Sequence, residues 1–246
     1  EELAKQAKAY DRPTPLTRED QLALKDLAAQ QKMIGDQLDA VEGTAAILAV
    51  DPAIPAAIRV LGTSAPESAT AWLDRLLRLA NTRFALQFGD ADPAVQVETG
   101  LTRPVGPTSL SAYMTAADFV PDPDATPTPS PTETLVPGVP DYPDMATLLD
   151  VGGARPGVFW PAPGQTGPEV VEALGALQLD DESAVTLLPS SATTVGASGT
   201  AVPARGVSGD ANVLVYDTDV SRELSAASRL DDTAQRGAPL TAATAY

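Results

Sequence analysis

The chain has 246 residues, of which 43% are hydrophobic and 20% are charged, so it can bury a sizeable core. Its 33 acidic and 16 basic side chains give a formal net charge of −17, which repels nucleic-acid phosphates, and we expect no nucleic-acid partner. The chain has no cysteine and no histidine, which excludes disulfides, thiolate nucleophiles, histidine-based catalytic triads and the usual zinc sites. We therefore expect neither a metal nor a cofactor.

No run of about 18 apolar residues is present, so we expect no membrane span within this segment. The chain opens on Glu1 rather than on Met, and its first residues lack the basic-then-apolar pattern of a signal peptide. We expect a mature or excised region of a longer product. The bias toward Ala and Arg is typical of GC-rich genomes such as those of actinobacteria.

An alternation of helices and strands is predicted along the first half of the chain. Apolar residues with a 3.6-residue period predict a helix over residues 17–39, and the apolar run at residues 44–50 predicts a strand buried on both faces. A left-handed C-cap is expected at Gly100. The further elements expected here are helices at residues 52–62 and 64–81, a strand at 83–89 and a short helix from residue 93.

Residues 121–143 contain eight prolines among Thr, Ser, Asp and Glu, and such a segment cannot form a core element. This Pro/Thr-rich segment is either an interdomain linker or an extended insertion. We favour the insertion because the alternation of elements resumes directly after it. O-glycosylation of its threonines and its serine is a hypothesis.

The second half of the chain predicts the same alternation. Residues 195–210 are rich in Gly and small side chains, with a short strand near residues 202–205, and periodicity ends after Asp231 and Asp232. Helices are expected at residues 142–151, 167–178 and 218–229, and strands at 156–162, 183–191 and 211–217.

This alternation with short connections is typical of βα units in a parallel sheet. Five strands are too few for a closed eight-stranded barrel. We therefore expect one α/β domain over residues 1–246, with its core at about 17–230, built as a partial or distorted (β/α) barrel with a Pro/Thr-rich insertion.

Aspartates recur where the predicted strands end: Asp51 after the first, Asp90 and Asp92 after the second, Asp217 and Asp219 after the last. Because the carboxyl ends of parallel strands lie at one edge of a sheet, these side chains are candidates for a shared site. Two of the four residues Asp51, Asp90, Asp92 and Asp217 are the candidate carboxylate pair of a glycosidase. The competing interpretation is that aspartates cap the following helices, which we expect for Asp51, Asp92 and Asp219. Asp90 and Asp217 remain the better catalytic candidates.

Two aromatic residues at strand ends, Trp160 and Tyr216, are candidates for the flat apolar surfaces on which sugar rings stack. Asp51 and Asp92 complete the ligand-binding candidates. A less favoured alternative is an oxygen-only site for calcium or magnesium, formed by the carboxylates of Asp90, Asp92 and Asp217.

Six strings of the sequence resemble an uncharacterised family of large actinobacterial exported proteins, usually anchored by a carboxyl-terminal membrane helix and encoded near the lipid II flippase. The resemblance covers roughly residues 40–230. It implies an extracytoplasmic location and a barrel segment of the glycoside hydrolase and polysaccharide deacetylase type. The family carries an aromatic residue before the aspartate that matches Asp90, where this chain has Gly89. The strings are AVDPAIPAAI, AWLDRLLRLA, FGDADPAV, FWPAPGQTGPEVVEALGAL, LLPSSATT and VLVYDTDVS.

Three functions are open at this point. The first is an extracytoplasmic cell-envelope module that binds or scaffolds a cell-wall glycan, such as a peptidoglycan strand, or an envelope protein, without catalysis. The second is a glycoside hydrolase-like enzyme that uses Asp90 and Asp217. The third is a purely structural module of a larger membrane-anchored protein, with the Pro/Thr-rich segment as a spacer.

Overall fold

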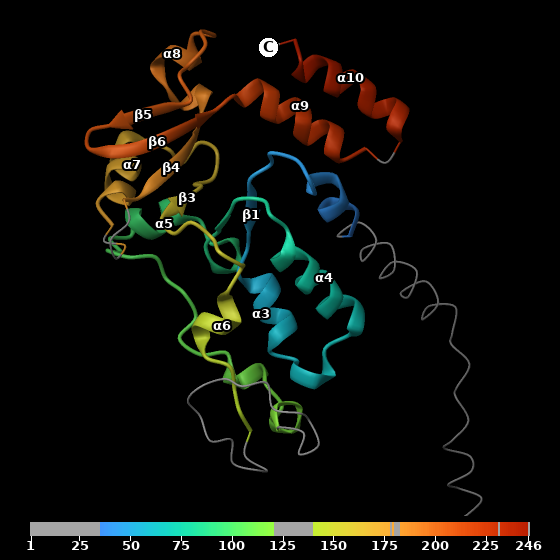
Figure 1. The fold of residues 1–246 in the computed structure, drawn as a ribbon. Helices are drawn as coiled ribbons and strands as arrows, with labels where there is room; N and C mark the ends of the chain where they lie inside the picture. Colours follow the sequence, from blue (N-terminus) through green and yellow to red (C-terminus); the bar gives the residue numbers. More distant parts are fainter. Residues whose placement is uncertain (1–34, 121–139, 178, 180–182, 231, 246) are drawn as a thin grey trace, which may run out of the picture. The chain divides into compact units, whose positions relative to one another are not determined.

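The computed structural model describes residues 35–120, 140–177, 179, 183–230 and 232–245 (Figure 1). The predicted helix at residues 17–39 lies outside the described residues up to residue 34, and the Pro/Thr-rich segment does so up to residue 139. The chain divides into two compact units. One comprises Glu1–Ala46 and Leu79–Asn81, and the other comprises Ile47–Arg78 and Thr82–Tyr246.

The first unit is described from residue 35 onward. Residues 35–41 are helical, as predicted, and Leu38 is buried. The side-chain amide of Asn81 lies 3.0–3.2 Å from the carbonyl oxygens of Val41, Thr44 and Ala46. These bonds hold residues 41–46 in a turn, so the strand predicted from residue 44 cannot begin there.

In the second unit, β1 (Leu48–Val50) and β2 (Arg83–Ala85) pair in parallel, with Leu48 opposite Arg83 and Val50 opposite Ala85. The connection between them carries α3 (Ala53–Arg59), a 3-10 turn η1 (Gly62–Ser64) and α4 (Glu67–Arg78). Both strands are parallel, as predicted, but shorter than the apolar runs that indicated them.

The buried side chain of Arg83 joins β2 to α4 and to the segment around Val151. The side chain of Arg83 is only 3% exposed, and its Nη1 donates to the carbonyl oxygens of Leu76 (2.7 Å) and Val151 (3.1 Å). The guanidinium therefore donates to a carbonyl group near the carboxyl end of α4, where helix carbonyls lack intrahelical donors.

The larger sheet contains four strands in the order β3-β4-β6-β5. Strands β3, β4 and β6 are parallel neighbours, whereas β5 is antiparallel to β6 at the edge. A parallel bridge between Phe84 and Arg155 links β2 to the segment that precedes β3. The bounds are β3 Val158–Phe159, β4 Val185–Pro189, β5 Arg205–Ser208 and β6 Ala211–Tyr216.

Helices connect and follow these strands (Figure 1). The expected C-cap at Gly100 is confirmed, because this residue has φ 83° and its N–H donates to the carbonyl oxygen of Val97. The helix bounds are α5 Pro93–Glu98, α6 Met145–Leu149, α7 Pro168–Gly175, α8 Thr194–Ala197, α9 Thr218–Ser228 and α10 Thr233–Ala243. The remaining 3-10 turns are η2 Phe88–Asp90, η3 Ser111–Tyr113, η4 Ala116–Phe119 and η5 Ser190–Ala192.

Helix α7 covers one face of the four-stranded sheet. Its buried Val171 packs with Leu188 of β4 and Val213 of β6, while Leu174, fully buried, packs with Phe159 of β3. Alternate residues of a strand point to opposite faces, so the residues between these lie on the other face of the sheet. Trp160 continues that alternation and lies on the face away from α7.

Two elements of the second half differ from the expectations. The short strand expected near residues 202–205 lies at β5, Arg205–Ser208, and it is antiparallel to β6 because the tight turn at Gly209, with φ 56°, returns the chain directly along β6. No element is predicted after Asp232, where apolar periodicity ends, but α10 begins at the next residue. The Asp232 carboxylate caps it by accepting the Ala234 N–H at 2.7 Å, and none of its residues is buried, so no apolar stripe marks it in the sequence.

Among the described residues, no helix is both long and apolar enough to cross a membrane.

Candidate functional site

A pocket of about 270 Å³ opens at the carboxyl ends of β2 and β3. One wall is the loop from β2 to α5, and the other is the loop that follows β3 and leads to α7. We call it the rim pocket. Its lining residues are Leu86, Gln87, Asp90, Ala91, Asp92, Pro93, Val158, Trp160, Pro161, Ala162 and Pro163. Three sequence candidates, Asp90, Asp92 and Trp160, are thus brought together.

The backbone of the first wall is unusual at Gly89 and Asp90. Gly89 has φ 67° and ψ 28°, and Asp90 has φ 53°, the only positive φ at a non-glycine residue in the described part of the chain. Aspartate is one of the few side chains that tolerates this left-handed region. Such outliers concentrate at functional sites, where the surroundings hold them in place.

Three hydrogen bonds hold this wall. The Gly89 N–H donates to Oδ1 of Asp51 at 3.0 Å, and the Asp90 N–H donates to the carbonyl oxygen of Gln87 at 2.9 Å. Asp92 caps α5 by accepting the Ala94 N–H at 2.9 Å, as expected from the sequence. The carboxylate of Asp90 itself is exposed and has no hydrogen bond or ion pair within the described residues. It is therefore available to a ligand.

The second wall presents the Trp160 ring. This ring lies between Phe84, at a centroid distance of 6.4 Å, and Tyr216, at 5.9 Å with an interplanar angle of 69°. Tilted and edge-on contacts of this kind are favourable for aromatic pairs. Two neighbours thus orient the ring, yet 43% of Trp160 remains exposed. The ring is held in place with a surface free for contact.

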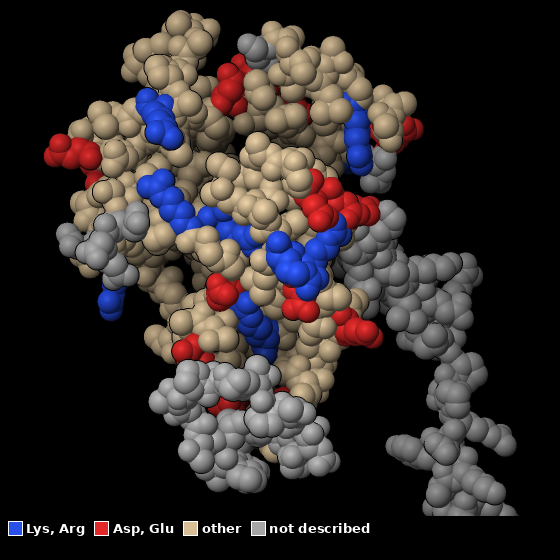
Figure 2. All heavy atoms as spheres, in the orientation of Figure 1, with Lys and Arg blue, Asp and Glu red and all other residues tan. Residues whose placement is uncertain are grey.

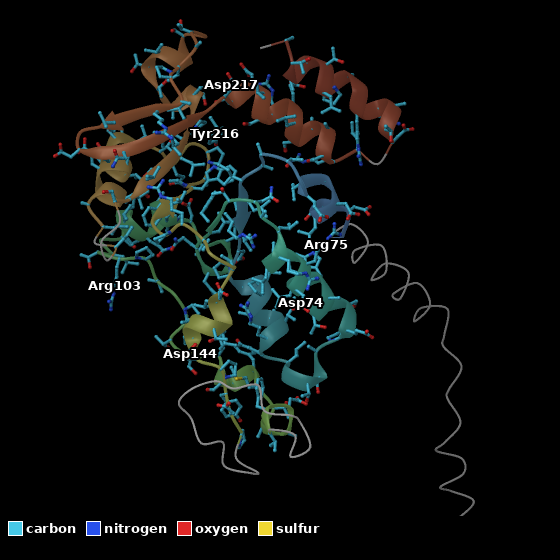
Figure 3. The ribbon with its side chains drawn as sticks, in the orientation of Figure 1. Asp74, Arg75, Arg103, Asp144, Tyr216 and Asp217 are labelled. Atoms are coloured by element: carbon cyan, nitrogen blue, oxygen red, sulfur yellow. The ribbon has the colours of Figure 1, made fainter. Side chains whose placement is uncertain are left out.

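Asp217 and Tyr216 lie at the end of β6, where α9 begins (Figure 3). Oδ1 of Asp217 accepts the N–H groups of Asp219 and Val220, each at 2.9 Å, so Asp217 is the N-cap of α9. The expectation that Asp219 caps this helix is wrong, because the helix begins one residue after Asp217 and Asp217 is its cap. Asp219 instead forms an ion pair of 2.6 Å with Arg222.

Asp51 also serves the backbone. Its Oδ1 accepts the Ala53 N–H at 2.8 Å as well as the Gly89 N–H. The expected capping role is therefore confirmed in part. Asp51 accepts the N–H of the first residue of α3, and it also links the loops that follow β1 and β2.

Hydroxyl groups link the ends of β4 and β6. The Ser190 hydroxyl accepts the Thr218 N–H at 3.1 Å, and the Thr218 hydroxyl accepts the Ser191 N–H at 3.0 Å. These bonds tie the η5 turn to the start of α9. The serines therefore have a structural role in the two loops.

No group of three or more acidic side chains in the described part of the chain is arranged to hold a metal ion. Asp217 does not line the rim pocket beside Asp90 and Asp92. On the face shown in Figure 2, acidic and basic side chains lie next to each other, without an extended surface of one sign.

Some features of the site were not foreseen. Gln87, the prolines of the second wall and the support of Trp160 by Phe84 depend on which strands are neighbours. The left-handed turn has one local signal, a glycine followed by an aspartate directly after a strand, because both residue types tolerate positive φ.

Comparison with protein-family models, with curated proteins and with solved structures finds no match to this chain. The rim pocket is therefore the basis for a functional conclusion.

Proposed function

We propose that this chain is a non-catalytic binding module of the cell envelope that holds one sugar residue of a glycan in the rim pocket. The observation that carries the proposal is that an oriented, exposed Trp160 ring and the available Asp90 carboxylate line the same pocket. Ligand sites commonly combine an apolar wall with a few placed polar groups.

The chemistry of the pocket suits a sugar ring. A pyranose presents an apolar C–H face, which can stack on the indole, and hydroxyl groups, which can donate to the carboxylates of Asp90 and Asp92. Hydrogen bonds to an ionised acceptor are about twice as strong as neutral ones. The volume of about 270 Å³ lies just below the roughly 300–1,000 Å³ of pockets that hold drug-sized ligands. It suits one ring rather than a chain of rings.

The hydrogen bonds of the other aspartates favour binding over hydrolysis. Asp51, Asp92 and Asp217 each use Oδ1 to accept backbone N–H groups at the start of a helix. A glycosidase needs two carboxyl groups that flank one bond, about 5–9.5 Å apart. Asp217, the proposed partner of Asp90 in that reaction, is not among the residues that line the rim pocket.

The proposal extends to the architecture and the location. Strands β1 and β2 are neighbours, the bridge at Phe84 leads toward β3, and β3, β4 and β6 follow in chain order. Sequential parallel neighbours form the wall of a (β/α) barrel, so this order supports a partial barrel. Together with the resemblance of six strings to exported proteins, it motivates an extracytoplasmic location.

The test is binding of the 246-residue chain to a glycan array and to muropeptides. We expect the wild-type chain to bind, Asp90→Asn to weaken binding by about tenfold because a charge-assisted hydrogen bond is lost, and Trp160→Ala to weaken it further. Asn retains the tolerance of the left-handed region, so Asp90→Asn should keep the turn.

Asp217→Asn is the matched control. Asn caps helices as well as Asp does, and Asp217 does not line the pocket, so binding should stay unchanged. If the wild-type chain binds no glycan, a structural role is favoured. If a glycan is instead cleaved and both Asn variants abolish cleavage, the chain is a glycosidase.

A further inference from the structure

The charges that line the rim pocket are all of one sign. Asp90 and Asp92 are its ionisable side chains, and none of the described residues that line it is Lys or Arg. A neutral sugar needs hydroxyl acceptors but does not need two carboxylates without a basic neighbour. This arrangement indicates a ligand that carries a positive charge.

We propose that the ligand of the rim pocket bears a protonated amine, as in an amino sugar with a free amino group. This inference rests on the proposed sugar-binding function and names its ligand class. The ammonium group would donate to the carboxylates of Asp90 and Asp92 while the ring stacks on Trp160.

The two carboxylates differ in how many oxygen atoms are available to a ligand. Asp92 uses Oδ1 for the cap of α5, which leaves Oδ2 for a ligand, whereas neither oxygen of Asp90 has a partner within the described residues. Both lie in one loop. Its backbone is fixed by the bond from the Gly89 N–H to Asp51 and by the bond from the Asp90 N–H to the carbonyl oxygen of Gln87. The backbone that presents both carboxylates is thus held before the ligand arrives, which reduces the entropy lost on binding.

Trp160 adds to the attraction. The face of an indole ring carries negative electrostatic potential and attracts ammonium groups, and tryptophan is the most effective side chain for this contact. The ring is partly exposed and oriented by its two aromatic neighbours. Trp160 therefore favours a cation by the same geometry that favours stacking.

The net charge of the whole chain acts in the same direction. A charge of −17 raises the local concentration of cations and repels anions such as sugar phosphates and uronates. This general attraction is screened by salt within about 8 Å at 0.15 M. Attraction that persists at this ionic strength would therefore come from the pocket.

The test compares glucose, N-acetylglucosamine and glucosamine at pH 6.5 and 0.15 M salt. An amine similar to an α-amino group, with a pKa near 7.7–8.0, is protonated at this pH, so only glucosamine is charged. The chain has two tryptophans, and Trp72→Phe leaves Trp160 as the single fluorescent reporter. Calorimetry on the unmodified chain gives the same affinities without this substitution.

We expect glucosamine to bind about tenfold more tightly than glucose, from two partly exposed charge pairs and the contact with the indole. Asp90→Asn and Asp92→Asn should each reduce this preference, and the double variant should remove it. Asn is an effective N-cap, so Asp92→Asn should keep α5. Asp74→Asn, which changes an exposed residue of α4 that does not line the pocket, is the control for net charge.

Three outcomes overturn the inference. If all three sugars bind equally, the sugar-binding function holds but the amine class is wrong. If glucosamine is preferred equally by the double variant, the attraction comes from the overall charge. If none of the sugars binds, and glycan arrays are also negative, the proposed function itself fails.

Discussion

The side chain of Asp51 holds the backbone of two separate segments in place. It is a candidate ligand-binding residue by position, yet its Oδ1 accepts the N–H groups of Ala53 and Gly89. The second bond reaches from the end of β1 to the turn that presents Asp90. Asp51 thus contributes to the rim pocket without lining it, through the conformation of Gly89.

Asp144, the N-cap of α6, offers a test at the same scale. Its carboxylate accepts the Thr147 N–H at 2.7 Å, and this backbone hydrogen bond lowers the pKa of Asp144 below its usual value (Figure 3). A carboxylate with a lowered folded pKa stabilises the fold fully above its unfolded pKa of about 3.9, and this contribution is lost as the pH falls through the lower folded value.

We predict that the free energy of unfolding of the wild-type chain falls more steeply below about pH 4 than that of Asp144→Asn. Asn caps the helix but does not titrate in this range. Urea unfolding at a series of pH values from 7 to 2 measures the difference. Parallel curves for the two proteins would mean that the Asp144 cap contributes nothing to the acid sensitivity.

At the scale of elements, α7 and the sheet are joined by an unusually close approach. Gly175 ends α7 against β6, and a Cβ at this position would overlap the Cβ of Ala211 and lie 2.9 Å from its Cα. Close helix-to-strand contact of this kind requires glycine. It also places Val171 and Leu174 deep against the sheet, where both are buried.

We predict that Gly175→Ala destabilises the fold by about 1–3 kcal/mol, the usual cost of overpacking. Helix propensity alone predicts the opposite sign, since Ala is favoured over Gly by about 1 kcal/mol. Gly237 of α10 has open space around its Cα, so Gly237→Ala is the matched control and should stabilise by about 0.5–1 kcal/mol. Equal stabilisation in both variants, measured by urea unfolding, would contradict the close contact.

At the scale of the whole molecule, the charge is the dominant feature. A net charge of −17 on 246 residues means that folding brings like charges closer together. Local pairs such as Asp219 with Arg222 are exposed, and pairs of this kind contribute little in water. The compact state therefore carries a general electrostatic repulsion that salt can screen.

We predict that raising sodium chloride from 0.01 to 0.15 M increases the free energy of unfolding at pH 7, because the screening length falls from about 30 to about 8 Å. The increase should disappear near pH 4.2, the isoelectric point of the sequence. Thermal unfolding followed by circular dichroism measures both. A salt effect of equal size at the two pH values would show that repulsion is not its source.

Much of the fold could be predicted because local patterns carry it. The parallel strands β1, β2, β3, β4 and β6 and most helices lie within the expected segments, since apolar runs and caps act over a few residues. Strand β5 lies a few residues after its expected place and α10 is not predicted at all, because their local signals are a tight turn at Gly209 and a cap at Asp232 rather than an apolar period.

The candidate site divides in the same way. From the sequence alone it follows that aspartates and aromatic residues come after the strands, and that the chain is acidic and has neither cysteine nor histidine. Which of these residues share a pocket and which cap helices depends on the three-dimensional fold. Asp90 and Trp160 meet because a bridge at Phe84 joins β2 to the segment that precedes β3, and the Asp217 carboxylate is occupied because α9 begins one residue after it. Neighbours in space are set by strand pairing and helix packing across long stretches of chain, which no local pattern encodes.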